Sequence, residues 1–124
     1  MPRPIHFELL ADNPARISKF YKEVFGWKIE KWDGPQDYWM CSTGEKDQPG
    51  INGGIMRRGK DGKFPPTTNT LDVPNVDEFI EKIKKHGGSI ISPKMAVPGV
   101  GWMAYCKDTE GNVFGIMQMD SDAK

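Results

Sequence analysis

One stretch, residues 6–27 (HFELLADNPARISKFYKEVFGW), most constrains the fold, because it has the pattern of a strand followed directly by a helix. Apolar residues occupy every second position of its start: Ile5, Phe7 and Leu9. His6 and Glu8 lie between them, as expected for a strand with one apolar and one polar face. We therefore expect the helix to cover the apolar face, with His6 and Glu8 on the other.

The predicted helix begins at Pro14, because Asn13 is a good N-cap and proline suits the first helical position. Its apolar side chains recur at helical spacing: Ile17, Phe20, Tyr21, Val24 and Phe25. Gly26 favours the left-handed conformation that ends a helix. We expect the whole apolar stripe to pack on the sheet.

The rest of the chain predicts a second helix and further strands. The second helix is expected after Asn75, with Glu78 completing a capping box. The strands are expected at 27–32, 38–42, 51–58, 67–73, 89–92, 102–107 and 112–119. The glycine pair at 53–54 indicates a bulge or a close approach by another group. Segment 93–101 (PKMAVPGVG) is expected to be a surface loop or a lid.

The order strand–helix–strand–strand–strand occurs twice. The first module spans about residues 4–58, the linker 59–66 and the second module about 67–119, within one domain of 124 residues. A helix on one face of each sheet leaves the other face to line a concave site.

Composition excludes several function classes. The 17 basic and 17 acidic residues give a formal net charge of zero, so we expect no nucleic-acid partner. Apolar runs are short, which predicts no membrane span and no secretory signal, and therefore a cytoplasmic protein. Cys41 and Cys106 lack metal-ligand spacing. They are expected to be buried hydrophobic residues, with a disulfide, a zinc site or a catalytic thiol as alternatives.

The phrase FYKEVFGW after a strand and the closing DTEGNVFGIMQM resemble the glyoxalase/bleomycin resistance protein/dioxygenase group, the vicinal oxygen chelate superfamily. The resemblance extends from Pro4 to about Met119 and is to its small, single-domain glyoxalase-like (lactoylglutathione lyase-related) members. It implies an α+β fold in which two βαβββ modules form a cup-shaped, eight-stranded mixed sheet with helices on the outside. It also implies a homodimer.

Metal-dependent members of this family bind a divalent ion through side chains from four strands. Carried over position by position, the first-strand ligand matches His6, the fourth-strand slot falls around residues 54–56, the fifth-strand slot on Thr68 and the last-strand slot on Gly115. A divalent site needs about three protein ligands. We therefore expect no metal cofactor. A divalent metal at His6, aided by Glu8 or backbone carbonyls, is the alternative.

His6 and Glu8 are the predicted catalytic residues, about 7 Å apart on one face of a strand. A histidine beside a carboxylate suits acid–base chemistry, and the alternative is a structural histidine bonded to the backbone. The predicted ligand-binding residues share that face or wall the cavity: Trp39, Thr68, Thr70, Trp102, Gly115 and Met117. Sheet packing for the threonines and core packing for the tryptophans are the alternatives.

Two functions follow from the resemblance. One is a glyoxalase-like lyase, isomerase or hydrolase acting on a small carbonyl compound, with His6 as acid or base. The other is a metal-free protein of the bleomycin-resistance type that binds and sequesters a small apolar or aromatic molecule. An interaction face of a homodimer is a third possibility. Each of the first two requires a small-molecule ligand.

Overall fold

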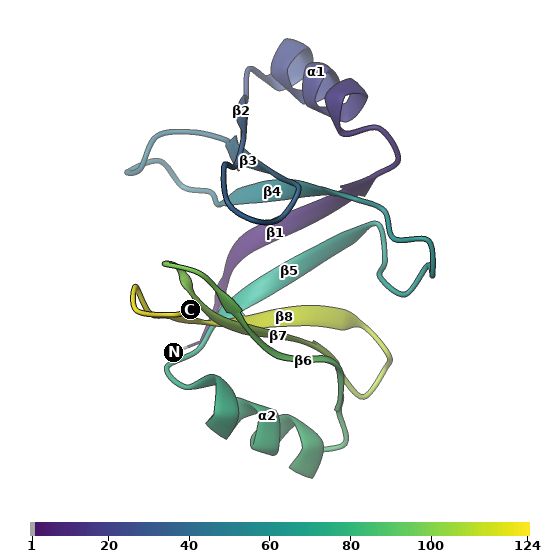
Figure 1. Cartoon of the computed structure of the whole chain (residues 1–124), viewed down its shortest axis with the longest axis vertical. Helices are drawn as coiled ribbons and strands as arrows, with labels where there is room; N and C mark the ends of the chain where they lie inside the picture. The colour runs from purple at the N-terminus through teal and green to yellow at the C-terminus, as the bar shows by residue number, and fades with distance from the viewer. Residues whose placement is uncertain (1) are drawn as a thin grey trace. The chain divides into compact units, whose positions relative to one another are not determined.

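The structure is a computed structural model, and it describes residues 2–124 (Figure 1). Its elements follow the predicted order: β1 (Pro4–Ala11), α1 (Pro14–Phe25), β2 (Lys28–Lys31), β3 (Tyr38–Ser42), β4 (Asn52–Arg57), β5 (Thr67–Asp72), α2 (Val76–Lys85), β6 (Ser89–Val97), β7 (Gly101–Lys107) and β8 (Val113–Met119). The α+β class and the repeated βαβββ order are therefore confirmed. The chain forms two compact units, the N-terminal unit (His6–Thr68) and the C-terminal unit (residues 2–5 with Asn69–Lys124).

The N-terminal unit has a mixed sheet in the order β2-β3-β4-β1 (Figure 1). Its outer pairs, β2 with β3 and β3 with β4, are antiparallel, whereas β4 and β1 are parallel. The buried core contains Ala11, Ile29, Cys41 and Ile55. Phe7 and Leu9 of β1 pack against this core from the same side as Ile17 and Tyr21 of α1. The alternation predicted for β1 is therefore confirmed, and His6 and Glu8 point to the other face.

The ends of α1 are set by local signals. The Asn13 side chain accepts a hydrogen bond from the Arg16 N–H at 3.0 Å, which caps the first turn. Gly26 has a φ of +74° and donates its N–H to the Lys22 carbonyl at 3.0 Å, which ends the last turn. Both predicted ends are confirmed.

The prediction that the whole apolar stripe of α1 packs on the sheet is wrong. Phe20, Val24 and Phe25 are 53%, 57% and 61% exposed. A helix presents one narrow stripe to a sheet, and Ile17 and Tyr21, four residues apart, occupy it. The exposed rings contact Tyr21 from outside: the ring centroids of Phe20 and Tyr21 are 5.2 Å apart.

The C-terminal unit repeats this arrangement with the strand order β5-β8-β7-β6 (Figure 1). Here β5 and β8 are parallel and the remaining pairs are antiparallel. Its core contains Val73, Val76, Ala104, Cys106 and Ile116, with side chains of α2 packed against it. At the start of β1, the Arg3 carbonyl accepts a hydrogen bond from the Asp72 N–H at 3.0 Å.

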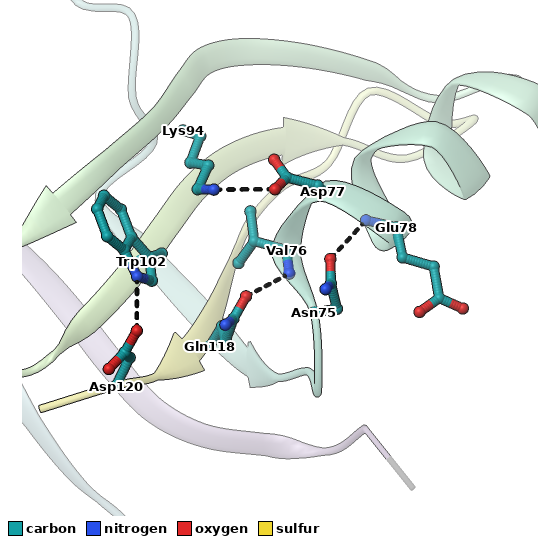
Figure 2. A network of polar contacts seen from close by, with 8 residues as sticks. All are labelled: Asn75, Val76, Asp77, Glu78, Lys94, Trp102, Gln118 and Asp120. Carbon is teal, nitrogen blue, oxygen red and sulfur yellow. Dashed lines mark hydrogen bonds and ion pairs between the residues drawn. The ribbon is translucent and has the colours of Figure 1, made fainter. Parts of the chain in front are cut away.

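Polar contacts fix the start of α2 in the C-terminal unit (Figure 2). Asn75 accepts a hydrogen bond from the Glu78 N–H at 2.9 Å, so the predicted cap is confirmed. The Gln118 side chain of β8 accepts the Val76 N–H at 3.0 Å. Lys94 of β6 lies 2.9 Å from Asp77. The first two contacts satisfy N–H donors that a helix start leaves unpaired, and the contacts from Gln118 and Lys94 hold α2 against the sheet.

The prediction of a loop or lid over residues 93–101 is wrong. Strand β6 continues from Ser89 to Val97, and only a tight turn, in which the Val100 N–H donates to the Val97 carbonyl at 2.9 Å, separates it from β7. Pro93 is accommodated because β6 is the edge strand and its pairing with β7 is irregular between Ser92 and Met95. Edge strands and bulges are where a strand tolerates proline.

Both cysteines are buried free thiols. Burial raises the pKa of the Cys41 thiol to about 11, and it has the same effect on the pKa of Cys106. Both thiols are therefore protonated near neutral pH, as expected for buried hydrophobic residues. Neither helix found within residues 2–124 has the length and apolar character needed to cross a membrane. The cytoplasmic location stays a prediction.

Candidate functional site

The polar residues of β1 meet a tyrosine of β3 inside the N-terminal unit. In the parallel pairing of β1 with β4, His6 lies opposite Asn52 and Glu8 opposite Gly54. Tyr38 of β3 reaches this face, and its hydroxyl oxygen lies 2.5 Å from His6 Nε2. The two rings are nearly parallel, at an interplanar angle of 14° with centroids 6.3 Å apart. We refer to His6, Tyr38 and Glu8 as the His6 cluster.

Gly54 makes room for the His6 cluster. A β carbon placed on Gly54 would overlap the hydroxyl and ring carbons of Tyr38. Gly54 is not among the glycines with positive φ, so it is needed for close approach rather than for backbone conformation. The close approach expected from the glycine pair is therefore confirmed, with Tyr38 over Gly54 and Phe7 over Gly53.

Burial controls the protonation of the His6 cluster. Desolvation lowers the pKa of His6 below its ordinary value of 6.5, so the imidazole is neutral at pH 7. Burial raises the pKa of the Tyr38 phenol, and the Glu8 carboxylate, which is hydrogen-bonded to the phenol, raises that pKa further. Glu8 is only 6% exposed.

These bonds couple the tautomer of His6 to the proton of Tyr38. Tyr38 has a single proton, and an ionised Glu8 can only accept a hydrogen bond. When the phenol donates to an ionised Glu8, the contact between His6 Nε2 and the Tyr38 oxygen places the imidazole proton on Nε2 and the basic lone pair on Nδ1. When a protonated Glu8 donates to the phenol oxygen, the phenol donates to Nε2 and the imidazole proton is on Nδ1. The arrangement provides a neutral imidazole whose tautomer depends on the protonation of Glu8.

Sequence reasoning missed Tyr38 as a site residue. Its strand was predicted correctly, at 38–42, but a strand pattern does not say which neighbour the strand pairs with. The available signal was the glycine at position 54, because a small residue on one strand often leaves space for a large one on the next.

In the C-terminal unit, the structure brings together three of the predicted ligand-binding residues. Thr70 pairs with Gly115 across β5 and β8, two residues before the pair Asp72 and Met117. Thr70 is 2% exposed, and its hydroxyl has no hydrogen-bond partner among the described residues. A β carbon on Gly115 would lie 2.8 Å from that hydroxyl oxygen. An unpaired buried hydroxyl beside a glycine is a site where a polar ligand atom would be stabilised.

The two predicted tryptophans lie on the helix-covered faces. Trp39 packs against the core under α1, and Lys31 and Arg57 lie over its ring at 5.8 Å and 5.6 Å from the centroid. Trp102 packs against the core under α2 and donates its indole N–H to Asp120 at 3.0 Å (Figure 2). Thr68 is buried, at 5% exposure. The ligand-binding role of these three residues stays a prediction.

The residues at the family's metal positions do not fit a divalent ion. The fourth-strand slot at 54–56 contains Gly54 and two apolar side chains, and the last-strand slot is Gly115. The space above Gly54 is occupied by Tyr38, and the space above Gly115 is bordered by Thr70. No group of three or more histidine, cysteine, aspartate or glutamate residues within 2–124 is placed to hold a metal. His6 and Glu8 alone provide fewer donors than a divalent site requires.

Residues 3–116 match the family model of the Glyoxalase/Bleomycin resistance protein/Dioxygenase superfamily. The chain belongs to this superfamily. The resemblance expected from the sequence is therefore confirmed, and the superfamily match covers both units described above.

Curated relatives within the superfamily include the protein named "Putative glyoxylase CFP32" from Mycobacterium bovis and its counterpart of the same name from Mycobacterium tuberculosis. Each is 26% identical over 119 residues, which cover 93% of this chain and 45% of the relative. The chain thus spans about half the length of the curated relatives that it matches.

Solved structures of the superfamily fold share the architecture at low sequence identity. The hypothetical protein BH1468 from Bacillus halodurans has a TM-score of 0.72 at 13% identity, covering 99% of this chain and 98% of that one. Methylmalonyl-CoA epimerase from Mycobacterium tuberculosis has a TM-score of 0.71 at 8% identity, covering 94% of this chain and 87% of that one. These likenesses support the fold.

Proposed function

We propose that this protein is a glyoxalase-like member of its superfamily that binds a small carbonyl compound and moves a proton on it without a divalent metal. The observation that supports the proposal is the His6 cluster, a neutral imidazole whose Nε2 lies 2.5 Å from the Tyr38 hydroxyl beside a buried carboxylate. Lyase or isomerase chemistry on a carbonyl compound requires a base that is unprotonated at neutral pH. The lowered pKa of His6 meets that requirement.

In the proposed step, a proton leaves the carbon next to the substrate carbonyl and binds His6 Nδ1. The electron pair of the broken C–H bond moves onto the carbonyl oxygen, which gives an enolate. With Glu8 ionised, Tyr38 and Glu8 hold the Nε2–H tautomer and stabilise the imidazolium through the Tyr38 hydrogen bond. Return of the proton to the opposite face of the same carbon completes an epimerisation. When the α-carbon carries a hydroxyl, as in a hemithioacetal, the proton returns to the former carbonyl carbon while the hydroxyl proton moves to the other oxygen, which completes an isomerisation with no net oxidation or reduction.

A second candidate function is binding without turnover, as in sequestration of the bleomycin-resistance type. The unpaired hydroxyl of Thr70 beside Gly115 favours it, because this arrangement suits recognition of a ligand oxygen and supplies no base. Under this alternative, Thr70 and Met117 contact the ligand within the C-terminal unit.

Proton exchange tests both candidates. Chelator-treated protein is incubated in D2O with hemithioacetals of 2-oxoaldehydes and with simple ketones, and loss of the α-proton signal is followed by NMR. The proposal predicts exchange that persists in excess chelator, falls about 100-fold or more in His6→Gln, and is unchanged in His86→Gln, which alters an exposed histidine. Exchange that needs added metal would contradict it. Thermal stabilisation by these compounds without any exchange would favour the binding alternative.

We also propose that the chain forms a homodimer. The exposed Phe20, Val24 and Phe25 of α1 provide an apolar surface that association would remove from water. Light scattering after size exclusion should give twice the 14.0 kDa chain mass. A Phe20→Ser/Phe25→Ser variant should shift the protein toward the monomer. A monomeric wild-type protein at about 100 μM would contradict the homodimer.

A further inference from the structure

A groove lies between α1 and strands β2 and β3, on the face of the N-terminal sheet that is covered by the helix. It has a volume of about 420 Å³, within the range of small-molecule sites. Ser18, Lys19 and Lys22 line it from the helix, and Ile29, Lys31 and Trp39 line it from the strands. Lys31 and Trp39 are direct cross-strand partners, so the strand side is continuous. The groove includes no residue of the His6 cluster.

The groove is locally positive in a chain of zero net charge. Three lysines and one acidic residue, Glu23, line the groove, so its lining residues have a net charge of +2. Lys31 is paired with Asp37 at 3.3 Å. Lys19 and Lys22 have no ion pair with a carboxylate of the described residues. The ammonium groups of Lys19 and Lys22 on the helix side are therefore available to bind an anion. The Glu23 carboxylate on the same helix repels an anion and weakens this attraction.

Ser18 lines the groove from the helix side without offering it a hydrogen bond. The residue is 6% exposed, and its hydroxyl is buried without a hydrogen-bond partner among residues 2–124. Because this oxygen has almost no accessible surface, a ligand atom in the groove does not reach it. Trp39 provides a flat apolar wall of the groove, with Lys31 over its ring.

We propose that this groove binds a small organic anion with a flat apolar body. The anionic group faces Lys19 and Lys22, and the flat body packs on Trp39 and Ile29. The charge selects for an anion, and the tryptophan selects for a planar molecule. This site is separate from the His6 cluster and does not depend on the function proposed for it.

An NMR titration tests the groove with 2-naphthoate as the probe and the neutral 2-naphthamide as its matched control. We expect saturable shifts at the backbone amides of the groove with naphthoate and much weaker binding of naphthamide. The Lys19→Gln/Lys22→Gln variant should raise the dissociation constant about 10-fold. Lys82→Gln, on α2 and paired with Glu78, should leave it unchanged.

Amide spectra of each variant without ligand show whether it folds, so loss of binding can be separated from loss of structure. Four results would overturn the proposal: no saturable shifts up to about 20 mM naphthoate, equal binding of naphthamide, full affinity in the lysine variant, or shifts centred on His6. In the His6→Gln variant the naphthoate affinity should equal that of the wild type. A failure of the function proposed for His6 would leave this result in place.

Discussion

The phenol of Tyr38 lies over Gly54, in the space that a β carbon at position 54 would occupy, and its hydroxyl is 2.5 Å from His6 Nε2. The Tyr38 side chain of β3 therefore fills the space that a side chain at Gly54 of β4 would occupy, and it contacts His6 of β1. The relationship explains two features together: Gly54, within the fourth-strand metal slot at 54–56, carries no side chain, and His6 has a neutral partner at that point.

Gly54→Ala tests the fit of Tyr38. The added methyl group cannot be placed without moving the phenol, so we expect the free energy of unfolding to fall by about 1–3 kcal/mol. In a Tyr38→Ala background the same change should cost much less, because the obstructing ring is gone. Urea unfolding of the four proteins gives the coupling. An equal cost in both backgrounds would show that the methyl group clashes with something else.

The burial of His6 predicts a pH dependence of stability. Its pKa in the folded protein lies below 6.5, so the unfolded chain binds this proton more tightly than the folded one. The contribution of His6 to the free energy of unfolding should therefore be complete above pH 6.5. It should decrease as the pH falls from 6.5 toward the lower pKa of the folded protein. His6→Gln should flatten the curve of urea midpoint against pH in that window. His86→Gln is the control, and an unchanged slope in His6→Gln would argue that other groups cause it.

Thr70→Val should stabilise the protein. The change removes a buried hydroxyl that has no partner among the described residues, and we expect a gain of about 1 kcal/mol in the free energy of unfolding. Thr43→Val is the matched comparison, because the Thr43 hydroxyl donates to the Ile51 carbonyl at 2.7 Å and its loss should destabilise by about 1 kcal/mol. If thermal or urea unfolding shows both variants destabilised alike, the Thr70 hydroxyl is bonded in solution.

The Asn75 cap of α2 should contribute measurably to the free energy of unfolding. Asn75→Ala removes the acceptor for the Glu78 N–H, and the free energy of unfolding should fall by about 1 kcal/mol. Asn69→Ala, at an exposed position of β5, is the control and should change it little. A loss in Asn75→Ala no larger than in Asn69→Ala would mean that the Gln118 bond to Val76 is enough to hold the helix start.

Local signals in the sequence predicted much of the fold. The helix ends at Asn13, Gly26 and Asn75 depend on residues within one turn, and the structure has all three. The faces of β1 follow from the two-residue period of the strand, and Phe7 and Leu9 pack as that period requires. Each of these features is determined by near neighbours along the chain.

Features that depend on distant residues were missed or predicted wrongly. The contact of Tyr38 with His6 joins residues 32 positions apart and depends on strand register, which no local pattern contains. Pro93 was expected to end a strand, but the strand lies at the edge of the sheet and tolerates it. The exposure of Phe20 and Phe25 depends on how much of the surface of α1 contacts the sheet.

The central claim is that His6 acts with Tyr38 and Glu8 and not with a divalent metal. The most direct measurement is the ¹⁵N NMR signal of the His6 imidazole while Zn²⁺, Ni²⁺ or Mn²⁺ is added to chelator-treated protein, with calorimetry of the same samples. The account predicts a neutral Nε2–H imidazole whose signals are unchanged and no stoichiometric binding that depends on His6. One equivalent of tightly bound metal that alters or broadens the His6 signals and is lost in His6→Gln would contradict it.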